Sequence, residues 1–368
     1  MAIVDLNASG LGLIRSEEDI TTSWVQGVLH GSGALPKDVT VTGFTTDRIG
    51  EGVGILSVLQ RVTPTYSNAA AGPKSFVVKY PTSDGNLRFA ADALEFYIRE
   101  LIFYRDCAPD APFKTAKCYG QAIASDNTDF TIAMEDIGYM RPLNQLEGVS
   151  LVEAKKLLEV LADFHAMWWG SPKLEEIEQT FKPVANPTYE FVLPPMFSNA
   201  WPAVQQHAGD LIPDSVAKIG EIWSEKCMWM LQNMMSPKTL CHGDFRADNL
   251  MFDGDHPAVI DFQITGTGSG MYDVAYFISQ SIHPDVRHGH DEELLNTYFS
   301  RLDHHGVTYE REEMMRQYLI GICFCVTYSV TAFPSFEENN DRGKSLLRDM
   351  LNRSLRAVVD NDALKVLL

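Results

Sequence analysis

Two aspartates and an asparagine lie close together in the sequence, around two short apolar runs. Asp244 and Asn249 precede the first run, and Asp261 follows the second. Carboxylate and amide oxygens are ligands that Mg²⁺ prefers, and a further carboxylate can accept the proton of a hydroxyl group. This set of residue types is what metal-assisted phosphoryl transfer needs, and it is also compatible with other metal-dependent reactions.

The two apolar runs predict the element that would position these side chains. Residues 250–252 and 258–260 are apolar on both faces of a strand, and Asp253-Gly254 between them is typical of a tight turn. We therefore expect a buried hairpin of two short strands, with its polar ends converging at one mouth.

The order of these residues also carries a family resemblance. His242-Gly243-Asp244, with Asn249 and Ile260-Asp261-Phe262 downstream, resembles the catalytic core of the aminoglycoside and choline kinase superfamily. The run Arg99–Tyr104, and Gln263 after the Asp-Phe pair, are most similar to its ecdysteroid-kinase-like branch. The resemblance implies an α+β, two-lobed protein-kinase-like fold, with an antiparallel-sheet N-lobe and a mainly helical C-lobe. The expected lobes are residues 1–138 and 139–368.

Two features of the N-terminal third are compatible with nucleotide binding. Gly50, Gly52 and Gly54 alternate between two strand-like runs, and a backbone without side chains can approach a phosphate closely. The same pattern is typical of an ordinary turn. Ser75–Tyr80 predicts a strand with Lys79 near its end, and such a lysine is usually a solvated edge charge.

A helix is expected after this strand. Apolar residues recur with helical spacing across residues 86–107, which predicts one continuous helix. Glu95 and Glu100 are its two carboxylates that could reach Lys79, and a surface position for both is the alternative. The resemblance favours Glu100.

The resemblance implies how the N-lobe would hold ATP. Lys79 would neutralise the α- and β-phosphates and would be held in place by Glu100. The glycine hairpin would cover the phosphates. The backbone of Glu135 and Ile137, in the link between the lobes, would bond the adenine edge.

The resemblance also assigns the catalytic roles. Asn249 and Asp261 would bind Mg²⁺, and Asp244 would accept the proton of a substrate hydroxyl. We expect His242 to hold the backbone of its own loop and Asp273 to support that loop from a helix start. His165, in the helix predicted over residues 150–169, is expected to be a core histidine bonded to backbone near the loop.

Two other segments have open interpretations. Residues 173–213 are rich in proline and aromatic residues, and predict either a cap over a substrate cleft or an ordered connection. Residues 266–270 contain three glycines and predict a flexible loop. Three or so helices are expected in residues 292–368.

Composition excludes some classes of function. The net charge of −19 disfavours binding to nucleic acid or to an anionic membrane. Six scattered cysteines favour reduced thiols over a disulfide framework, and we expect a cytoplasmic protein without a secretory signal. The apolar stretch 318–333 is shorter than a membrane span and predicts a buried helix.

The sequence therefore predicts an ATP- and Mg²⁺-dependent kinase that phosphorylates a hydroxyl group of a small metabolite. A nucleotide-binding pseudokinase that acts as an interaction protein is the alternative. A protein kinase is disfavoured because Gln263 replaces the glycine of Asp-Phe-Gly and no long activation segment follows. The substrate stays open between cationic compounds, which suit an acidic cleft, and apolar hydroxyl compounds, which the resemblance suggests. The oligomeric state also stays open.

Overall fold

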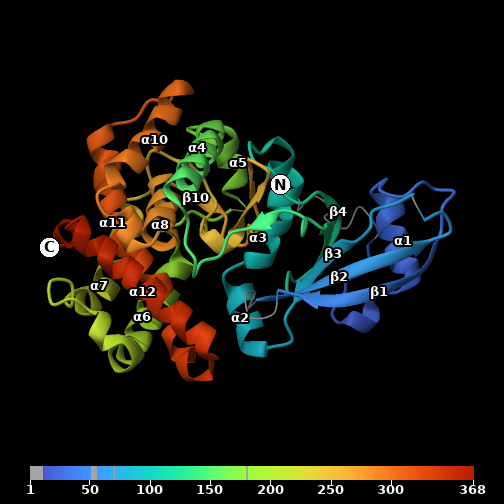
Figure 1. Cartoon of the computed structure of the whole chain (residues 1–368), viewed down its shortest axis with the longest axis horizontal. Coiled ribbons are helices and arrows are strands. Elements are labelled where there is room, and N and C mark those ends of the chain that lie inside the picture. Colours follow the sequence, from blue (N-terminus) through green and yellow to red (C-terminus); the bar gives the residue numbers. More distant parts are fainter. Residues whose placement is uncertain (1–10, 51–55, 70, 180) are drawn as a thin grey trace. The chain divides into compact units, whose positions relative to one another are not determined.

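The computed structural model describes residues 11–50, 56–69, 71–179 and 181–368, which form two compact units (Figure 1). The first unit comprises Met1–Arg141 together with Ile260–Gln263, and the second comprises Pro142–Val259 and Ile264–Leu368. The sequence placed the division after residue 138 and did not anticipate that the short segment 260–263 belongs to the first unit.

The first unit is built on a five-stranded antiparallel sheet, as predicted. The strand order is β1-β2-β3-β5-β4, and neighbouring strands are antiparallel. The strands are β1 (Val41–Ile49), β2 (Ser57–Tyr66), β3 (Phe76–Pro81), β4 (Cys118–Ile123) and β5 (Phe130–Glu135).

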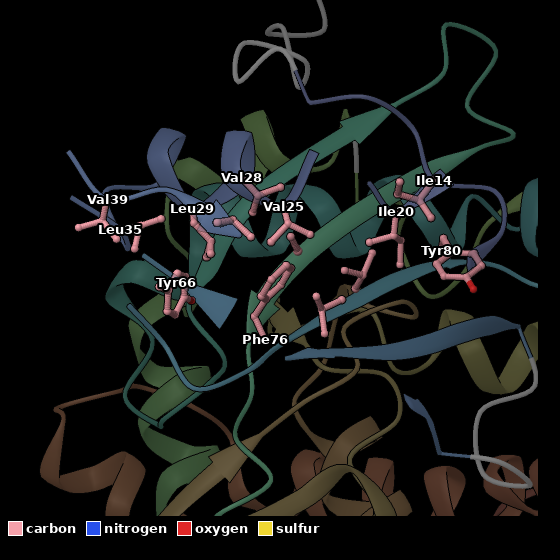
Figure 2. Packing of buried hydrophobic residues seen from close by; sticks show 14 residues of the cluster. Ile14, Ile20, Val25, Val28, Leu29, Leu35, Val39, Tyr66, Phe76 and Tyr80 are labelled. Atoms are coloured by element: carbon pink, nitrogen blue, oxygen red, sulfur yellow. The ribbon is translucent and has the colours of Figure 1, made fainter. Parts of the chain in front are cut away.

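One face of this sheet packs against helix α1 (Thr22–Gly31). Val25, Val28 and Leu29 of the helix meet Phe76 and other apolar side chains of the sheet in one buried cluster (Figure 2). Because successive side chains of a strand point to opposite faces, Val78 and Tyr80 belong to this cluster while Lys79 between them does not. The packing of α1 therefore directs Lys79 to the other face of the sheet.

The helix predicted over residues 86–107 is wrong as one continuous element. It is divided into α2 (Gly85–Ala93), α3 (Phe96–Ile102) and the π-helical turn η2 (Phe103–Cys107). The break lies at Glu95, whose φ of 56° is left-handed. A residue in this conformation cannot continue a right-handed helix, so α3 starts anew after it.

The second unit is mainly helical, as predicted. Its longest predicted helix begins with a capping box between Ser150 and Glu153. Its helices are α4 (Leu151–Trp168), α5 (Lys173–Ile177), α6 (Pro187–Ala208), α7 (Ile219–Gln232), α8 (Met271–Ser281), α9 (Pro284–Arg287), α10 (Asp291–His304), α11 (Arg311–Val330) and α12 (Asp341–Asp360).

Short strands complete the second unit. β8 (Leu250–Asp253) and β9 (His256–Val259) form the predicted hairpin, with Gly254 at a φ of 60° in its turn. β7 (Thr239–Cys241) pairs with β10 (Gly266–Gly268). The flexible loop predicted at 266–270 is therefore wrong: Gly268 is in a buried strand, where an added Cβ would lie 2.8 Å from Val184. These glycines serve close packing rather than mobility.

The proline-rich segment 173–213 is mostly helical. Helix α6 contains Pro194, Pro195 and Pro202 in its interior, where each removes a backbone donor. Burial of Phe197, whose ring stacks on Trp223 of α7 at 4.3 Å, compensates for the lost bonds. Tertiary packing thus overrides the local preference of proline.

Helix α11 is the one candidate membrane span among the described residues, by length and apolar composition alone. The candidate covers Arg311–Glu337, and 61% of its most apolar window is buried inside the protein. Its buried residues pack on α8 and α12 within the second unit. This packing agrees with the predicted buried helix.

Candidate active site

Lys79 is the centre of a buried charged cluster in the first unit. Its Nζ lies 2.8 Å from Glu100 Oε1 and 3.2 Å from Asp261 Oδ1. Burial lowers the pKa of Lys79, but the charges of Asp261 and Glu100 outweigh burial and raise the pKa above its ordinary value. Lys79 is therefore a fixed cation on the sheet face opposite α1. The structure pairs it with Glu100, the glutamate that the resemblance favoured.

Asp261 reaches this cluster from a distant part of the sequence. Its backbone is left-handed, with a φ of 66°, a conformation that costs a non-glycine residue about 1–2 kcal/mol. The next residue, Phe262, is fully buried and stacks on Phe103 at 3.5 Å. Gln263 then donates a hydrogen bond to Ser57 Oγ at 3.1 Å. These two anchors tie the segment to the first unit and position the Asp261 carboxylate.

The predicted adenine-binding link follows β5. The Glu135 N–H donates to Lys117 O at 2.8 Å, so Glu135 still belongs to the sheet. Ile137 is nearly buried, and its C=O accepts a hydrogen bond from the Met140 N–H at 2.9 Å. Within the described part of the chain, the Ile137 N–H donates no hydrogen bond.

Only part of the predicted glycine hairpin can be placed. Gly50 directly follows β1, with a left-handed φ of 69° that favours glycine. An added Cβ there would lie 3.2 Å from Leu59 Cδ1. Gly52 and Gly54 lie outside the described residues.

The Asp244 loop lies in the second unit, directly before β8. Asn249 Nδ2 donates to the Asp244 backbone oxygen at 2.9 Å and to its Oδ2 at 2.8 Å. Arg246 Nε lies 3.2 Å from Asp244 Oδ1, and its Nη1 lies 2.9 Å from Asp248 Oδ2. Asp244 is thus oriented by an amide and a guanidinium. The side chains of Arg246 and Asp248 are each only 18% exposed, so this pair is largely shielded from water.

A buried carboxylate supports this loop, as the sequence predicted for Asp273. It accepts hydrogen bonds from the His242 N–H at 2.6 Å and the Gly243 N–H at 2.8 Å. Gly243 has a φ of 87°, and a Cβ there would lie 2.5 Å from Ile264 O, so only glycine fits. His242 Nδ1 accepts from the Asp244 N–H at 3.1 Å and holds the loop backbone, as expected.

His165 is a core histidine, as predicted, but its expected bond to backbone is wrong. Its ring nitrogens contact Tyr298 Oη at 2.8 Å and Asp273 Oδ2 at 3.1 Å. Helix α8 begins at Met271, so its first turn places the Asp273 carboxylate between the histidine and the loop. His165 therefore supports the loop through Asp273. The Cys241 thiol lies within 4.8 Å of the His165 ring and the Asp273 carboxylate, but it bonds Ser269 O. Burial raises the pKa of this thiol well above its ordinary value.

Tyr276 is a contact of Asp244 that sequence reasoning missed. It is buried in α8, one turn after Asp273, and its hydroxyl bonds the Asp244 carboxylate. Burial and the charge of Asp244 raise the Tyr276 pKa well above its ordinary value, so the hydroxyl keeps its proton. The i, i+3 spacing from Asp273 placed it on the same helix face and was the available signal.

The structure thus brings the predicted residues together in two groups. Lys79, Glu100 and Asp261 contact one another in the first unit, which also holds the link at Glu135 and Ile137. Asp244 and Asn249 contact each other in the second unit.

Comparison with known proteins agrees with this arrangement. The sequence profile of the ecdysteroid kinase-like family matches residues 51–308, more than half of the chain. The chain belongs to the ecdysteroid kinase-like family. It is accordingly a small-molecule phosphotransferase, as the sequence predicted. A search of the curated proteins found no match.

Solved structures share the fold at low sequence identity. An aminoglycoside 2′-phosphotransferase in complex with GDP is 15% identical, with a TM-score of 0.54 over 92% of this chain and 99% of the other. Choline kinase from Cryptosporidium parvum is 11% identical, with a TM-score of 0.52 over 94% and 95%. An ethanolamine kinase from Plasmodium vivax is 14% identical, with a TM-score of 0.50 over 95% and 90%. These likenesses establish the predicted two-lobed kinase-like fold.

Proposed function

We propose that this protein transfers the γ-phosphoryl group of ATP to a hydroxyl group of a small-molecule metabolite, with Mg²⁺ as the metal. The observation that carries the proposal is the buried Lys79 cation held by Glu100 and Asp261. A buried charge is costly unless it serves a partner or a ligand, and phosphate oxygens are natural ligands of an ammonium group. The family membership and the GDP complex of a relative support nucleotide binding here.

The chain's own residues fit the proposed metal. Asp261 offers a carboxylate that is 36% exposed, and Asn249 offers an amide oxygen. Both N–H bonds of the Asn249 amide point to Asp244, which leaves the amide oxygen facing away from that carboxylate. Oxygen donors of this kind suit Mg²⁺, which keeps several waters and phosphate oxygens as further ligands. When bound, the metal would neutralise charge on the phosphates.

The remaining residues would position the reactants. Lys79 would bind α- and β-phosphate oxygens, and Glu100 would hold its ammonium group. The Ile137 N–H would donate to the adenine edge, beside the Glu135 backbone. Gly50 would start the hairpin over the phosphates.

Asp244 would accept the proton of the substrate hydroxyl. The hydroxyl oxygen forms a bond to the γ-phosphorus, the bond from that phosphorus to the ADP oxygen breaks, and the proton passes to Asp244. Asn249, Arg246 and Tyr276 hold the carboxylate in one orientation for this step. Phosphoryl transfer depends mainly on positioning and charge neutralisation, which this arrangement supplies.

The acceptor is proposed to be a small hydroxyl compound because relatives are named for aminoglycosides, choline and ethanolamine. A cytoplasmic location is proposed because all six cysteines are free thiols. The pseudokinase alternative is disfavoured, since the described candidate positions Lys79, Glu100, Asp244, Asn249 and Asp261 carry competent side chains.

The test is ATP consumption by the purified full chain with Mg²⁺ and a panel of alcohols, sugars and amino alcohols. Asp244→Ala should reduce turnover by about 10²–10⁴-fold and leave MgATP binding largely unchanged, because the residue acts on the acceptor. Asp261→Ala should instead weaken MgATP binding. Unchanged turnover in Asp244→Ala would exclude this residue as the base, and normal MgATP affinity in Asp261→Ala would exclude the metal assignment.

A further inference from the structure

Asp136, between the two predicted adenine-binding residues, is held by a closed set of hydrogen bonds. Its Oδ2 lies 2.6 Å from Arg61 Nε and 2.6 Å from Ser75 Oγ. Its Oδ1 accepts from the Gly138 N–H at 2.9 Å and from Arg61 Nη2 at 3.3 Å. We call Arg61, Ser75, Asp136 and Gly138 the Asp136 clamp.

The clamp lies on the same sheet face as Lys79. Arg61 pairs with Val77 across β2 and β3, and Val77 is two residues from Lys79. Because residues opposite each other on neighbouring strands share a face, and residues two apart along a strand do so as well, Arg61 and Lys79 point to one side of the sheet. The side chains of Arg61 and Asp136 are 34% and 11% exposed, so the pair is largely shielded from water.

Two backbone groups beside Asp136, in residues 136–140 between the lobes, are already engaged in hydrogen bonds. The Gly138 N–H is used by Asp136, and the Ile137 C=O is used by the Met140 N–H at 2.9 Å. Within the described part of the chain, the Ile137 N–H stays without an acceptor. The link therefore presents a donor at Ile137 with its neighbouring acceptor already engaged.

This pattern suits adenine better than guanine. Adenine carries an acceptor at N1 and a donor at its 6-amino group, so a backbone N–H can serve N1. Guanine carries a donor at N1, another at its 2-amino group and an acceptor at O6. Its two donors would need a free carbonyl beside the N–H, and the Ile137 C=O is turned toward Met140.

We propose that the Asp136 clamp makes the nucleotide site selective for adenine over guanine nucleotides by fixing the backbone of residues 136–140. The inference rests on the proposed nucleotide-binding function and adds the residues that make the site discriminate against guanine. Burial raises the Asp136 pKa, but the hydrogen bonds from Arg61, Ser75 and Gly138 and the positive charge of Arg61 outweigh burial and hold the pKa below its ordinary value. The carboxylate is therefore ionised and the clamp closed at neutral pH. Guanine would need the Ile137 carbonyl oxygen as an acceptor. Releasing this oxygen from the Met140 N–H would require the clamped backbone of residues 136–140 to rearrange, and this cost makes the site selective.

The experiment measures MgATP and MgGTP binding to the full chain by calorimetry, without an acceptor substrate. We expect MgATP to bind at least about tenfold more tightly than MgGTP, the size typical of one mismatched base contact. Asp136→Ala frees the Gly138 N–H and should reduce this ratio at least about threefold. Arg61→Met leaves the link sequence intact and should reduce the ratio in the same direction, so it decides the matter if Asp136→Ala does not fold.

Asp129→Asn is the matched control. Asp129 is also paired with an arginine, since its Oδ2 lies 2.6 Å from Arg15 Nε. It directly precedes β5, whereas Asp136 directly follows that strand. This variant should keep the wild-type ratio. Equal binding of the two nucleotides by the wild type, or an unchanged ratio in both clamp variants, would overturn this inference and leave the proposed function standing. Failure of both nucleotides to bind would overturn the proposed function and this inference with it.

Discussion

The buried Asp273 carboxylate offers the most direct test of how the Asp244 loop is supported. It is fully buried and accepts three hydrogen bonds, from the His242 and Gly243 N–H groups and from His165 Nε2. In Asp273→Asn one oxygen becomes an N–H₂ group. The remaining oxygen can serve at most two of the three donors, and the amide hydrogens would face the third.

The cost follows from this count. One buried donor without an acceptor costs about 1–3 kcal/mol, and loss of charge from the two remaining bonds adds about 1 kcal/mol. We therefore expect Asp273→Asn to lower the free energy of unfolding by about 3 kcal/mol. If movement of the Asp244 loop relieves half or more of this unfavourable free energy, Asp244 loses its position. Turnover should then fall by roughly tenfold to a hundredfold.

Urea unfolding and steady-state turnover measure the two effects. The affinity for ATP measured without Mg²⁺ should change little, because Lys79 and Glu100 belong to the other unit. Asp163→Asn is the control: this carboxylate of α4 is paired with Arg301 and His305 and is 16% exposed, and among the described residues no hydrogen bond joins it to the Asp244 loop. It should cost at most about 1 kcal/mol. Wild-type stability and turnover in Asp273→Asn would refute the supporting role.

Two further predictions concern the Lys79 cluster. Glu100→Gln should weaken MgATP binding about tenfold, because the amide keeps an acceptor but loses the charge that holds Lys79. Glu95→Gln is the control and should have little effect. Equal effects of the two variants in a binding titration would contradict the pairing of Lys79 with Glu100. The folded-state pKa of Lys79 is raised above 10.5, so its contribution to stability is complete below pH 10.5 and is lost as the pH rises through the folded value. The difference in unfolding free energy between wild type and Lys79→Met should therefore shrink above pH 10.5, and a difference that stays constant to higher pH would argue against a charged Lys79.

Several local features of the second unit could be predicted from short sequence patterns. The β8–β9 hairpin, the capping box that starts α4, and Asp273 in the first turn of α8 depend on residues close in sequence, so short motifs predict them. The Asp244 to Asn249 spacing likewise predicts their contact, because one loop and one 3-10 turn join them.

Tertiary structure decided the features that depend on distant contacts. Local spacing predicted one helix across residues 86–107, whereas the chain breaks at Glu95 and presents Glu100 to Lys79. The proline-rich segment 173–213 predicted a cap over a cleft or an ordered connection, whereas packing on Trp223 holds a helix there. The glycines of residues 266–270 predicted a flexible loop, whereas β10 is a buried strand. In each case long-range burial outweighs a preference that is worth little per residue.

The charged clusters show the same division. The residue types of Lys79, Asp244 and Asp261 could be read as chemical groups from the sequence alone. Which of them meet could not, because Lys79 and Asp261 are 182 residues apart and Arg61 and Asp136 are 75 apart. Sequence determines which charges exist, and folding determines their partners, because only the packed sheet and the anchored Phe262 bring those side chains within bonding distance.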